Sequence, residues 1–267
     1  MITSRQNPRI KLYRALAKRK YRDREGKFVL DGVRQLTGAL ESGLRLHEVF
    51  WCDALLVSGP GRALLDQLDP GTAQHEVSEH VFRALSDRAE PQGIAAIAER
   101  RRQRLADLSM SADGVVLALE DIRDPGNLGT IVRAADAAGA DGVVVLGHST
   151  DPYDPKVVRA TMGSIFHVSV AEAGDAAEFI GWAREHGVRT YAASTRGTQT
   201  HFETDFTGRT AFLLGNEARG LSAEALDSAD AIIKIPMLGR SESLNAAMAA
   251  SILLYEVMRQ RLHGGNI

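Results

Sequence analysis

The chain has 267 residues, enough for one large domain or two smaller ones, and its 44% hydrophobic and 25% charged content is typical of a globular protein. Cys52 is the only cysteine, which excludes an internal disulfide and a cysteine-rich metal site. The sequence contains no apolar leader and no run of about 20 apolar residues that could span a bilayer. We therefore expect a cytoplasmic protein that binds no metal and does not enter membranes.

The net charge of −2 argues against a nucleic-acid-binding protein, but the distribution of charge argues for one. Residues 1–111 carry 19 Lys and Arg against 14 Asp and Glu, whereas residues 112–267 carry 13 against 20. Ten of the basic residues lie within residues 1–27. Such a segment suits the phosphates of a nucleic acid, although a solvated basic helix without a partner has the same pattern. The candidate RNA-binding residues are Arg5, Arg9, Lys11, Lys18, Arg19 and Lys20.

Residues 28–99 are expected to form a small α/β domain. Apolar runs predict strands or strand-like segments at 28–30, 46–51 and 94–98. Helices are predicted at 32–42, 62–68 and 78–85. No part of this region has the spacing of a catalytic site. The arginine-rich residues 100–110 are interpreted as a linker, which predicts domains at 1–108 and 109–267.

The second half alternates between strand and helix patterns, which predicts a parallel sheet with helices on both faces. Strands are predicted at 115–119, 143–146, 166–170, 188–193, 211–214 and 232–235. Helices are predicted up to residue 138, at 175–185 and at 244–262, and residues 154–159 form a polar loop or a short helix. Glycine-bearing turns follow three of the strands. Ligands collect beyond the carboxyl ends of strands in such sheets, so several of these loops are expected to line one site.

Two interpretations compete for the turn after residue 119. A dinucleotide-binding unit would place glycines between a strand and a helix, as Gly126 and Gly129 are placed here. However, these glycines do not form the G-x-G-x-x-G fingerprint, and no acidic residue follows the next strand. The alternative is a different α/β site, in which Asn127 in the loop and Arg133 in the helix converge.

The segment from residue 235 to 262 changes from a strand-end loop into a long helix. Ser241 and Ser243 are the predicted caps, because a serine oxygen can accept hydrogen bonds from first-turn amides. Alternate spacings of four and three place one set of residues on a single face: Leu244, Met248, Ser251, Tyr255, Met258 and Leu262. This face is apolar enough to pack against the protein's own sheet or against a partner.

Three segments resemble the ordered motifs of one enzyme family: DPGNLGTIVRAADAAGA (124–140), LLGNEARGLS (213–222) and IPMLGRSESLNAAMA (235–249). They are similar to the SpoU/TrmH family of RNA ribose 2′-O-methyltransferases, in the SPOUT superfamily. SRQNPRIK (4–11) and SDRAEPQGIAAI (86–97) resemble the substrate-binding domain of ribosomal-RNA members, which has an L30e-like fold. The stretch Tyr153 to Lys156 is similar to antibiotic-resistance members. The likeness covers nearly the whole chain.

The resemblance implies properties that periodicity alone does not. The C-terminal domain is expected to contain a deep trefoil knot, to bind S-adenosyl-L-methionine and to form a homodimer in which both subunits shape each site. Family cofactor contacts correspond to Gly215, Ile235 and Leu244, with Leu214, Met237 and Asn245 close by. The family's polar active-site set corresponds to Asn127, Arg133, Glu217, Ser243 and Asn245.

The implied reaction is methyl transfer to a ribose 2′-hydroxyl, with 23S ribosomal RNA as the expected substrate. The family proposal makes Arg133 the base, but a guanidinium remains protonated in proteins, so we expect Arg133 to hold phosphate and stabilise developing negative charge. Asn127, Asn245 and Ser243 would orient the hydroxyl or the loops, and Glu217 would orient Arg133 or a loop amide. The alternatives are a tRNA ribose methyltransferase, a non-catalytic RNA-binding or assembly protein, and a dinucleotide-dependent oxidoreductase.

Overall fold

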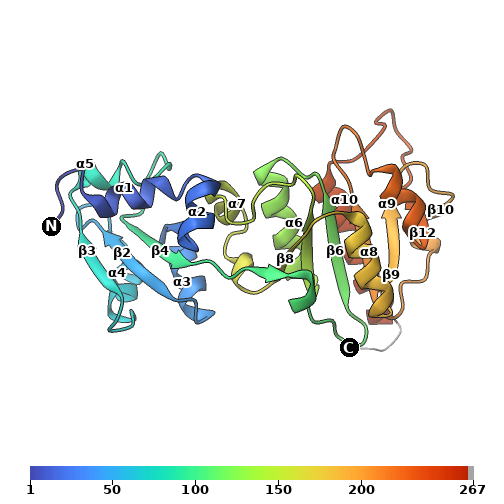
Figure 1. Cartoon of the computed structure of the whole chain (residues 1–267), viewed down its shortest axis with the longest axis horizontal. Helices are drawn as coiled ribbons and strands as arrows, with labels where there is room; N and C mark the ends of the chain where they lie inside the picture. Colours follow the sequence, from blue (N-terminus) through green and yellow to red (C-terminus); the bar gives the residue numbers. More distant parts are fainter. Residues whose placement is uncertain (264–267) are drawn as a thin grey trace. The chain divides into compact units, whose positions relative to one another are not determined.

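The computed structural model describes residues 1–263, which form two compact units (Figure 1). The first unit contains Met1–Arg101 together with Tyr153–Phe166. The second contains Arg102–Pro152 and the chain from His167 onward. Within the described residues, no helix is both long and apolar enough to cross a membrane.

The first unit is built on a four-stranded sheet with the order β1 (Lys27–Asp31), β4 (Ile94–Glu99), β2 (Leu46–Trp51) and β3 (Ala73–Glu76). Strands β1 and β2 run antiparallel to β4, whereas β3 runs parallel to β2. Residues 94–98 are buried because β4 lies inside the sheet with apolar clusters on both faces. The helices are α1 (Pro8–Ala15), α2 (Arg19–Glu25), α3 (Val33–Glu41), α4 (Gly59–Asp66), α5 (Glu79–Phe82) and α7 (Pro155–Ala160).

Helix α7 belongs to this unit although it lies far along the chain. Val158 is fully buried in the cluster that also contains residues of β1, α3 and β4. The ring of Tyr153 packs edge-on against Phe28 with 4.8 Å between centroids, and its hydroxyl donates to the carbonyl of Arg101. A segment of the second half of the sequence therefore completes the core of the first unit.

The second unit contains an eight-stranded parallel sheet, as the α/β pattern predicted. Its order is β10 (Gln199–Thr200), β12 (Ala231–Lys234), β9 (Arg189–Ala193), β11 (Thr210–Leu214), β6 (Val115–Glu120), β7 (Gly142–Leu146), β8 (Ser169–Ala173) and β5 (Gln103–Arg104). Helices α8 (Ala176–Glu185) and α9 (Ala223–Ser228) cover one face, and α6 (Pro125–Ala137) and α10 (Ala246–His263) cover the other (Figure 1). The central strands are apolar throughout because both faces are covered.

Some predicted elements require correction. The strand expected at 166–170 begins at Ser169, and Phe166 lies in a 3₁₀ turn (Ser164–Phe166) that packs in the first unit. The residues interpreted as a linker include β5, which pairs with β8 at the edge of the second sheet. The sequence patterns did not predict β3, β10 and α9, which are only two to six residues long. Such short segments give too few residues for a period to be recognised.

The predicted serine caps of the last helix are wrong. Helix α10 begins at Ala246, and Asn245 Oδ1 accepts from the amides of Ala247 and Met248 at 2.9 and 3.4 Å. Ser241 Oγ instead donates to the carbonyl of Ser243 at 2.8 Å. Asparagine forms this kind of cap as readily as serine does, so residue type alone did not decide between them.

The apolar face predicted for the last helix is not its core face. Met248, Tyr255 and Leu262 are 61%, 50% and 53% exposed, one on every second turn of α10. The buried side is formed by other residues, many of them small: Ala246, Ala247, Ala250, Leu253, Leu254 and Val257. The alanines let α10 pack closely on α6, and they leave an apolar stripe facing outward.

Candidate functional site

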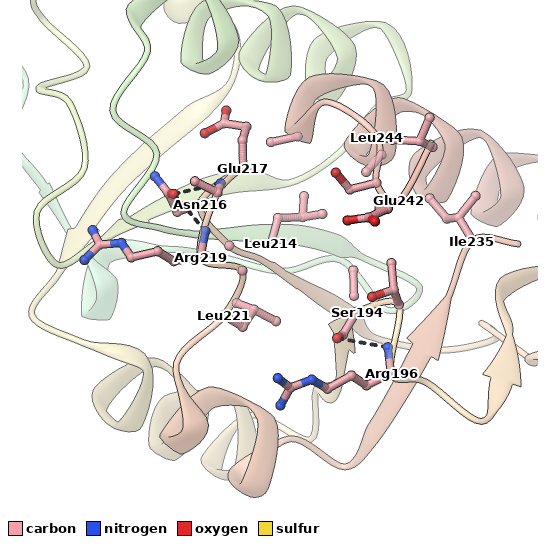
Figure 2. Close-up of a pocket in the computed structure, with 18 of the residues that line it drawn as sticks. Ser194, Arg196, Leu214, Asn216, Glu217, Arg219, Leu221, Ile235, Glu242 and Leu244 are labelled. Carbon is pink, nitrogen blue, oxygen red and sulfur yellow. Dashed lines mark hydrogen bonds between the residues drawn. The ribbon is translucent and has the colours of Figure 1, made fainter. Parts of the chain in front are cut away.

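A cavity of about 400 Å³ lies at the carboxyl ends of β9, β11 and β12, beside the start of α10 (Figure 2). Loops from several strand ends thus meet at one site, as the sheet topology predicted. Its lining comprises residues 193–196, 214–221, Leu226, Ile235, Met237, 242–244, Ala246 and Ala249.

The loop after β11 is folded tightly on itself. A side chain at Gly215 would place its Cβ 2.3 Å from the carbonyl carbon of Gly220, so only glycine permits this approach. The amide of Gly220 donates to the carbonyl of Asn216 at 2.7 Å. Asn216 Oδ1 accepts from the amides of Ala218 and Arg219 at 3.0 and 3.2 Å. The loop therefore presents a fixed wall of backbone to the cavity.

Asp121, immediately after β6, ties this loop to the sheet. Its φ of 57° is uncommon for a residue other than glycine. Its carbonyl accepts from Asn216 Nδ2 at 3.0 Å, and its Oδ2 accepts from Arg219 Nη2 at 3.1 Å. The backbone conformation of Asp121 thus brings both of its acceptors to the loop that walls the cavity.

Three predicted site residues from the three distant motifs form a hydrogen-bonded chain. Asn245 Nδ2 donates to Asn127 Oδ1 at 3.0 Å, and Asn127 Nδ2 donates to the carboxylate of Glu217. The hydrogen bonds at the two ends of this chain determine how the side-chain amides of Asn127 and Asn245 are oriented. Glu217 can only accept, and Asn245 Oδ1 is already committed to the amides that open α10. We call this chain, Asn245 to Asn127 to Glu217, the amide relay.

Arg133 and Ser243 lie outside the amide relay. Arg133 is exposed on α6 and makes no hydrogen bond or ion pair within residues 1–263. Glu217 contacts Asn127 and not Arg133, so the expectation that Glu217 orients the arginine has no counterpart in this geometry. Ser243 lines the cavity, and its carbonyl accepts from Ser241.

Six residues were expected to contact a cofactor, and five of them line the cavity: Leu214, Gly215, Ile235, Met237 and Leu244. Asn127, Arg133 and Asn245 are not part of its lining. Sequence reasoning missed Ser194, Arg196 and Glu242, which Figure 2 places around the cavity. The first two follow β9, so their place beyond a predicted strand was an available signal. The side chains of Arg196 and Glu242 have no ion-pair partner among the described residues.

Some of the candidate RNA-binding residues of the first unit have hydrogen-bond or ion-pair partners within the protein, and others have none among the described residues. Arg9 pairs with Glu48 at 2.9 Å, Arg19 lies 3.7 Å from Asp23, and Arg5 donates to the carbonyl of His80 at 3.2 Å. The exposed side chains of Lys11, Lys18 and Lys20 make no such contact within residues 1–263. The basic segment therefore offers free lysines beside partly neutralised arginines.

This architecture defines a two-unit α/β protein whose second unit holds a polar and apolar cavity at the carboxyl edge of a parallel sheet. Residues 114–255 match the SpoU rRNA methylase family, and residues 7–96 match the MRM3-like substrate binding domain. The chain belongs to the SpoU rRNA methylase family.

Named relatives match over nearly their whole length. The chain is 34% identical to the 23S rRNA (uridine(2479)-2′-O)-methyltransferase of Streptomyces viridochromogenes, covering 98% of this chain and 93% of the relative. It is 31% identical to the 23S rRNA (guanosine(2553)-2′-O)-methyltransferase RlmP of Bacillus subtilis, covering 96% and 98%.

Solved structures of the family have the same architecture. The SpoU methyltransferase AviRb of S. viridochromogenes, in complex with the cofactor AdoMet, superposes with a TM-score of 0.89 at 33% identity, covering 96% of this chain and 99% of that one. An AdoMet-bound rRNA methyltransferase of Sinorhizobium meliloti gives a TM-score of 0.89 at 35% identity and 97% coverage of both chains.

Proposed function

We propose that this protein transfers a methyl group from S-adenosyl-L-methionine (AdoMet) to the 2′-hydroxyl of one ribose in ribosomal RNA, with 23S rRNA as the favoured substrate. The observation that carries the proposal is the convergence of the three family motifs. Residues 127, 217 and 245 join in the amide relay beside a cavity of about 400 Å³ at the strand ends. The whole-length relatives named as 23S rRNA 2′-O-methyltransferases support the same substrate.

The lining of the cavity offers AdoMet apolar surface, backbone hydrogen bonds and charged groups. Leu214, Ile235 and Leu244 offer apolar contacts for an adenine ring, and the backbone of the loop after β11 offers hydrogen bonds. Arg196 and Glu242 are unpaired charges on the same lining, and they complement the carboxylate and the cationic groups of an amino-acid moiety. AdoMet, when bound, supplies a methyl group activated by its sulfonium.

The residues of the chain would act mainly by positioning. Arg133, exposed and unpaired, would bind a phosphate next to the target ribose and stabilise negative charge that develops on the attacking oxygen. The amide relay would hold the loops of the three motifs in register, and Ser243 would hydrogen-bond within the loop before α10.

The test of this function is transfer of labelled methyl from AdoMet to RNA prepared from cells that lack the gene. We expect label in large-subunit ribosomal RNA, at a nucleotide that resists alkaline hydrolysis on its 3′ side. Label in transfer RNA alone would favour the alternative tRNA substrate. RNA binding without AdoMet binding or methyl transfer would favour a non-catalytic assembly protein. The drug sensitivity of cells with and without the gene would separate ribosome maturation from antibiotic resistance.

Further organisation is proposed from the family pattern. We propose that residues 1–108 form an L30e-like domain that binds the RNA. Residues 109–267 form the methyltransferase domain, which contains a trefoil knot. The protein works in the cytoplasm as a homodimer that forms through the C-terminal domain. The outward apolar stripe of α10, formed by Met248, Tyr255 and Leu262, supports the dimer.

The replacement Tyr255→Glu is expected to make the protein monomeric. A carboxylate in the middle of the stripe would be buried unpaired in the dimer, at a cost of several kcal/mol, but would stay hydrated in the monomer. Sedimentation at micromolar concentration measures this, with Ala223→Glu, at an exposed position of α9, as the control that adds the same negative charge. A wild-type monomer with full activity would contradict the proposed dimer.

Replacing Lys11, Lys18 and Lys20 with alanine is expected to weaken RNA binding and to flatten its salt dependence. Loss of three phosphate contacts lowers the slope of log K against log[salt] by about 2 to 3. Titration of RNA at four salt concentrations measures the slope, and Arg34→Gln, an exposed arginine elsewhere in the unit, is the control. An unchanged slope would remove the lysines from the RNA interface.

The replacement Glu242→Gln is expected to weaken AdoMet binding about fivefold while changing the binding of S-adenosylhomocysteine less. The two ligands differ in the methyl group and in the positive charge that it places on sulfur, and a carboxylate attracts that charge more strongly than a neutral amide does. Calorimetric titration of both ligands measures the difference without relying on activity, and Glu224→Gln on α9 is the control. Equal losses for both ligands would show that Glu242 does not sense the sulfonium.

A further inference from the structure

A second cavity, of about 250 Å³, lies entirely within the first unit. It is walled by α1, β1, α3, α7 and the turn before residue 88. The apolar part of its lining includes Ala17, Val29 and Leu85. Its polar residues are Tyr13, Arg14, Asp31, Gln35, Asp87 and Arg159. The cavity contains none of the residues that line the cavity assigned to AdoMet.

Two polar side chains of this lining each have one atom without a hydrogen-bond partner among the described residues. Gln35 is only 4% exposed, and its Oε1 accepts from the amide of Asp31 at 3.0 Å. Its Nε2 has no partner within residues 1–263. Asp31 Oδ2 accepts from Ser86 at 2.8 Å, whereas Oδ1 is buried without a partner among the described residues. Buried polar groups are normally satisfied, so the unpartnered Asp31 Oδ1 favours a ligand with a donor, and Gln35 Nε2 can donate to an acceptor of the same ligand.

The same cavity has two arginines without partners. Arg14 extends from α1 and Arg159 from α7, and neither side chain makes a hydrogen bond or ion pair within residues 1–263. Asp87 also lies in the lining and is exposed. The charge of Arg159 acts on the cavity, since it lowers the pKa values of Tyr13 and Asp31 against the larger, opposite effect of burial. Two free guanidinium groups beside a narrow cavity suit a phosphate.

The contribution of α7 links this cavity to the rest of the protein. Pro155 and Arg159 fall within residues 114–255, the part that matches the methylase family, whereas the other lining residues fall within the part that matches the substrate-binding domain. The cavity therefore exists only where both parts of the sequence are present.

We propose that this cavity takes one unpaired nucleotide of the RNA substrate, with the base inside and its phosphate on Arg14 and Arg159. The proposal rests on the proposed function, because RNA is the polymer that the protein is inferred to bind. A volume of about 250 Å³ is sufficient for one base. Sequence-specific RNA recognition mainly reads unstacked bases along their hydrogen-bonding edges. Each of the four bases presents an N–H donor for Asp31 beside an acceptor for Gln35 on its hydrogen-bonding edge, so the four nucleotides are compared in the test.

The experiment measures saturation transfer by NMR from the full-length protein to AMP, CMP, GMP and UMP. Ala17→Leu fills the cavity from an exposed position on its lining, and Arg159→Gln removes one of the free cations. The matched control is Arg34→Gln, an exposed arginine without a partner, next to Gln35 in sequence but outside the lining. We expect Ala17→Leu to abolish nucleotide binding and Arg159→Gln to weaken it about tenfold, with no change in the control.

Three outcomes would overturn the proposal. These are no saturable binding of any nucleotide to the wild-type protein, equal weakening by Arg159→Gln and Arg34→Gln, and nucleotide binding that survives Ala17→Leu. AdoMet binding and methyl transfer, measured on the same samples, separate this proposal from the function. If the wild-type protein methylates ribosomal RNA and Ala17→Leu leaves its KM for that RNA unchanged, the nucleotide site fails while the function stands.

Discussion

Replacing Arg133 with alanine is expected to lower kcat for methyl transfer by about 100- to 1,000-fold, the usual effect of removing one group that stabilises transition-state charge. The guanidinium makes no hydrogen bond or ion pair within residues 1–263 and does not line the cavity assigned to AdoMet. Its loss should therefore leave the fold and AdoMet affinity unchanged. A side chain held by no protein partner is available for RNA. Single-turnover methylation and calorimetric AdoMet binding measure the two quantities separately.

Asp136→Asn provides the matched control, because Asp136 is also charged, exposed and without a partner, one turn further along α6. Arg133→Lys shows whether the positive charge alone is needed or two parallel hydrogen bonds to one phosphate are needed. Lysine retains the charge but cannot donate in this bidentate geometry. Wild-type kcat for Arg133→Ala would remove this residue from the site. A matching loss of AdoMet affinity would instead mean that Arg133 supports the cofactor.

Local sequence patterns predicted the parallel sheet and the edge at which the cavity lies, for a physical reason. Strands covered on both faces are apolar throughout, and the loop after each strand must lie at the same edge of a parallel sheet. The cavity residues Leu214, Gly215 and Ile235 could therefore be expected near one another. The polar set came from the family resemblance and not from periodicity.

The features that failed depend on tertiary contacts. The choice between Ser243 and Asn245 as the cap of α10 depends on where the preceding loop runs, which residue type does not decide. Helix α7 has a local pattern that fits either unit, and only the packing of Val158 assigns it to the first. The outward direction of Tyr255 could not be read from an apolar period, because the alanines of α10 form the core face instead.

The amide relay leads to a prediction of similar size. Asn127→Asp is expected to lower kcat about 100-fold at pH 8, although the new side chain has almost the same shape. Asn127 Nδ2 donates to the carboxylate of Glu217, whereas a second carboxylate could only accept and would repel it. The acceptor that faces Asn245 would be retained, so the damage should be confined to the link between the first two motifs.

The pH dependence of this variant identifies the cause. Two carboxylates within hydrogen-bond distance cannot both ionise easily, so the pKa of one of them is raised. Below that raised pKa the protonated group becomes an O–H donor and restores the link. The activity of Asn127→Asp relative to wild type should therefore rise as pH falls from 8 towards 5.5. Asn127→Ala lacks the second carboxylate, so its relative activity should stay flat over the same range.

A pH-independent ratio for Asn127→Asp would mean that the polarity of the relay does not matter and that Asn127 acts through its shape. The polarity is determined by the two ends, because Glu217 has no proton to give and Asn245 Oδ1 is occupied by the first amides of α10. Asn245→Asp should consequently preserve the cap and break only the hydrogen bond to Asn127 Oδ1. Protonation of Glu217 would not restore that bond, so the activity of this variant should not recover by that route. The orientation of two side-chain amides thus connects the cap of the last helix to the carboxylate of Glu217 in the loop after β11.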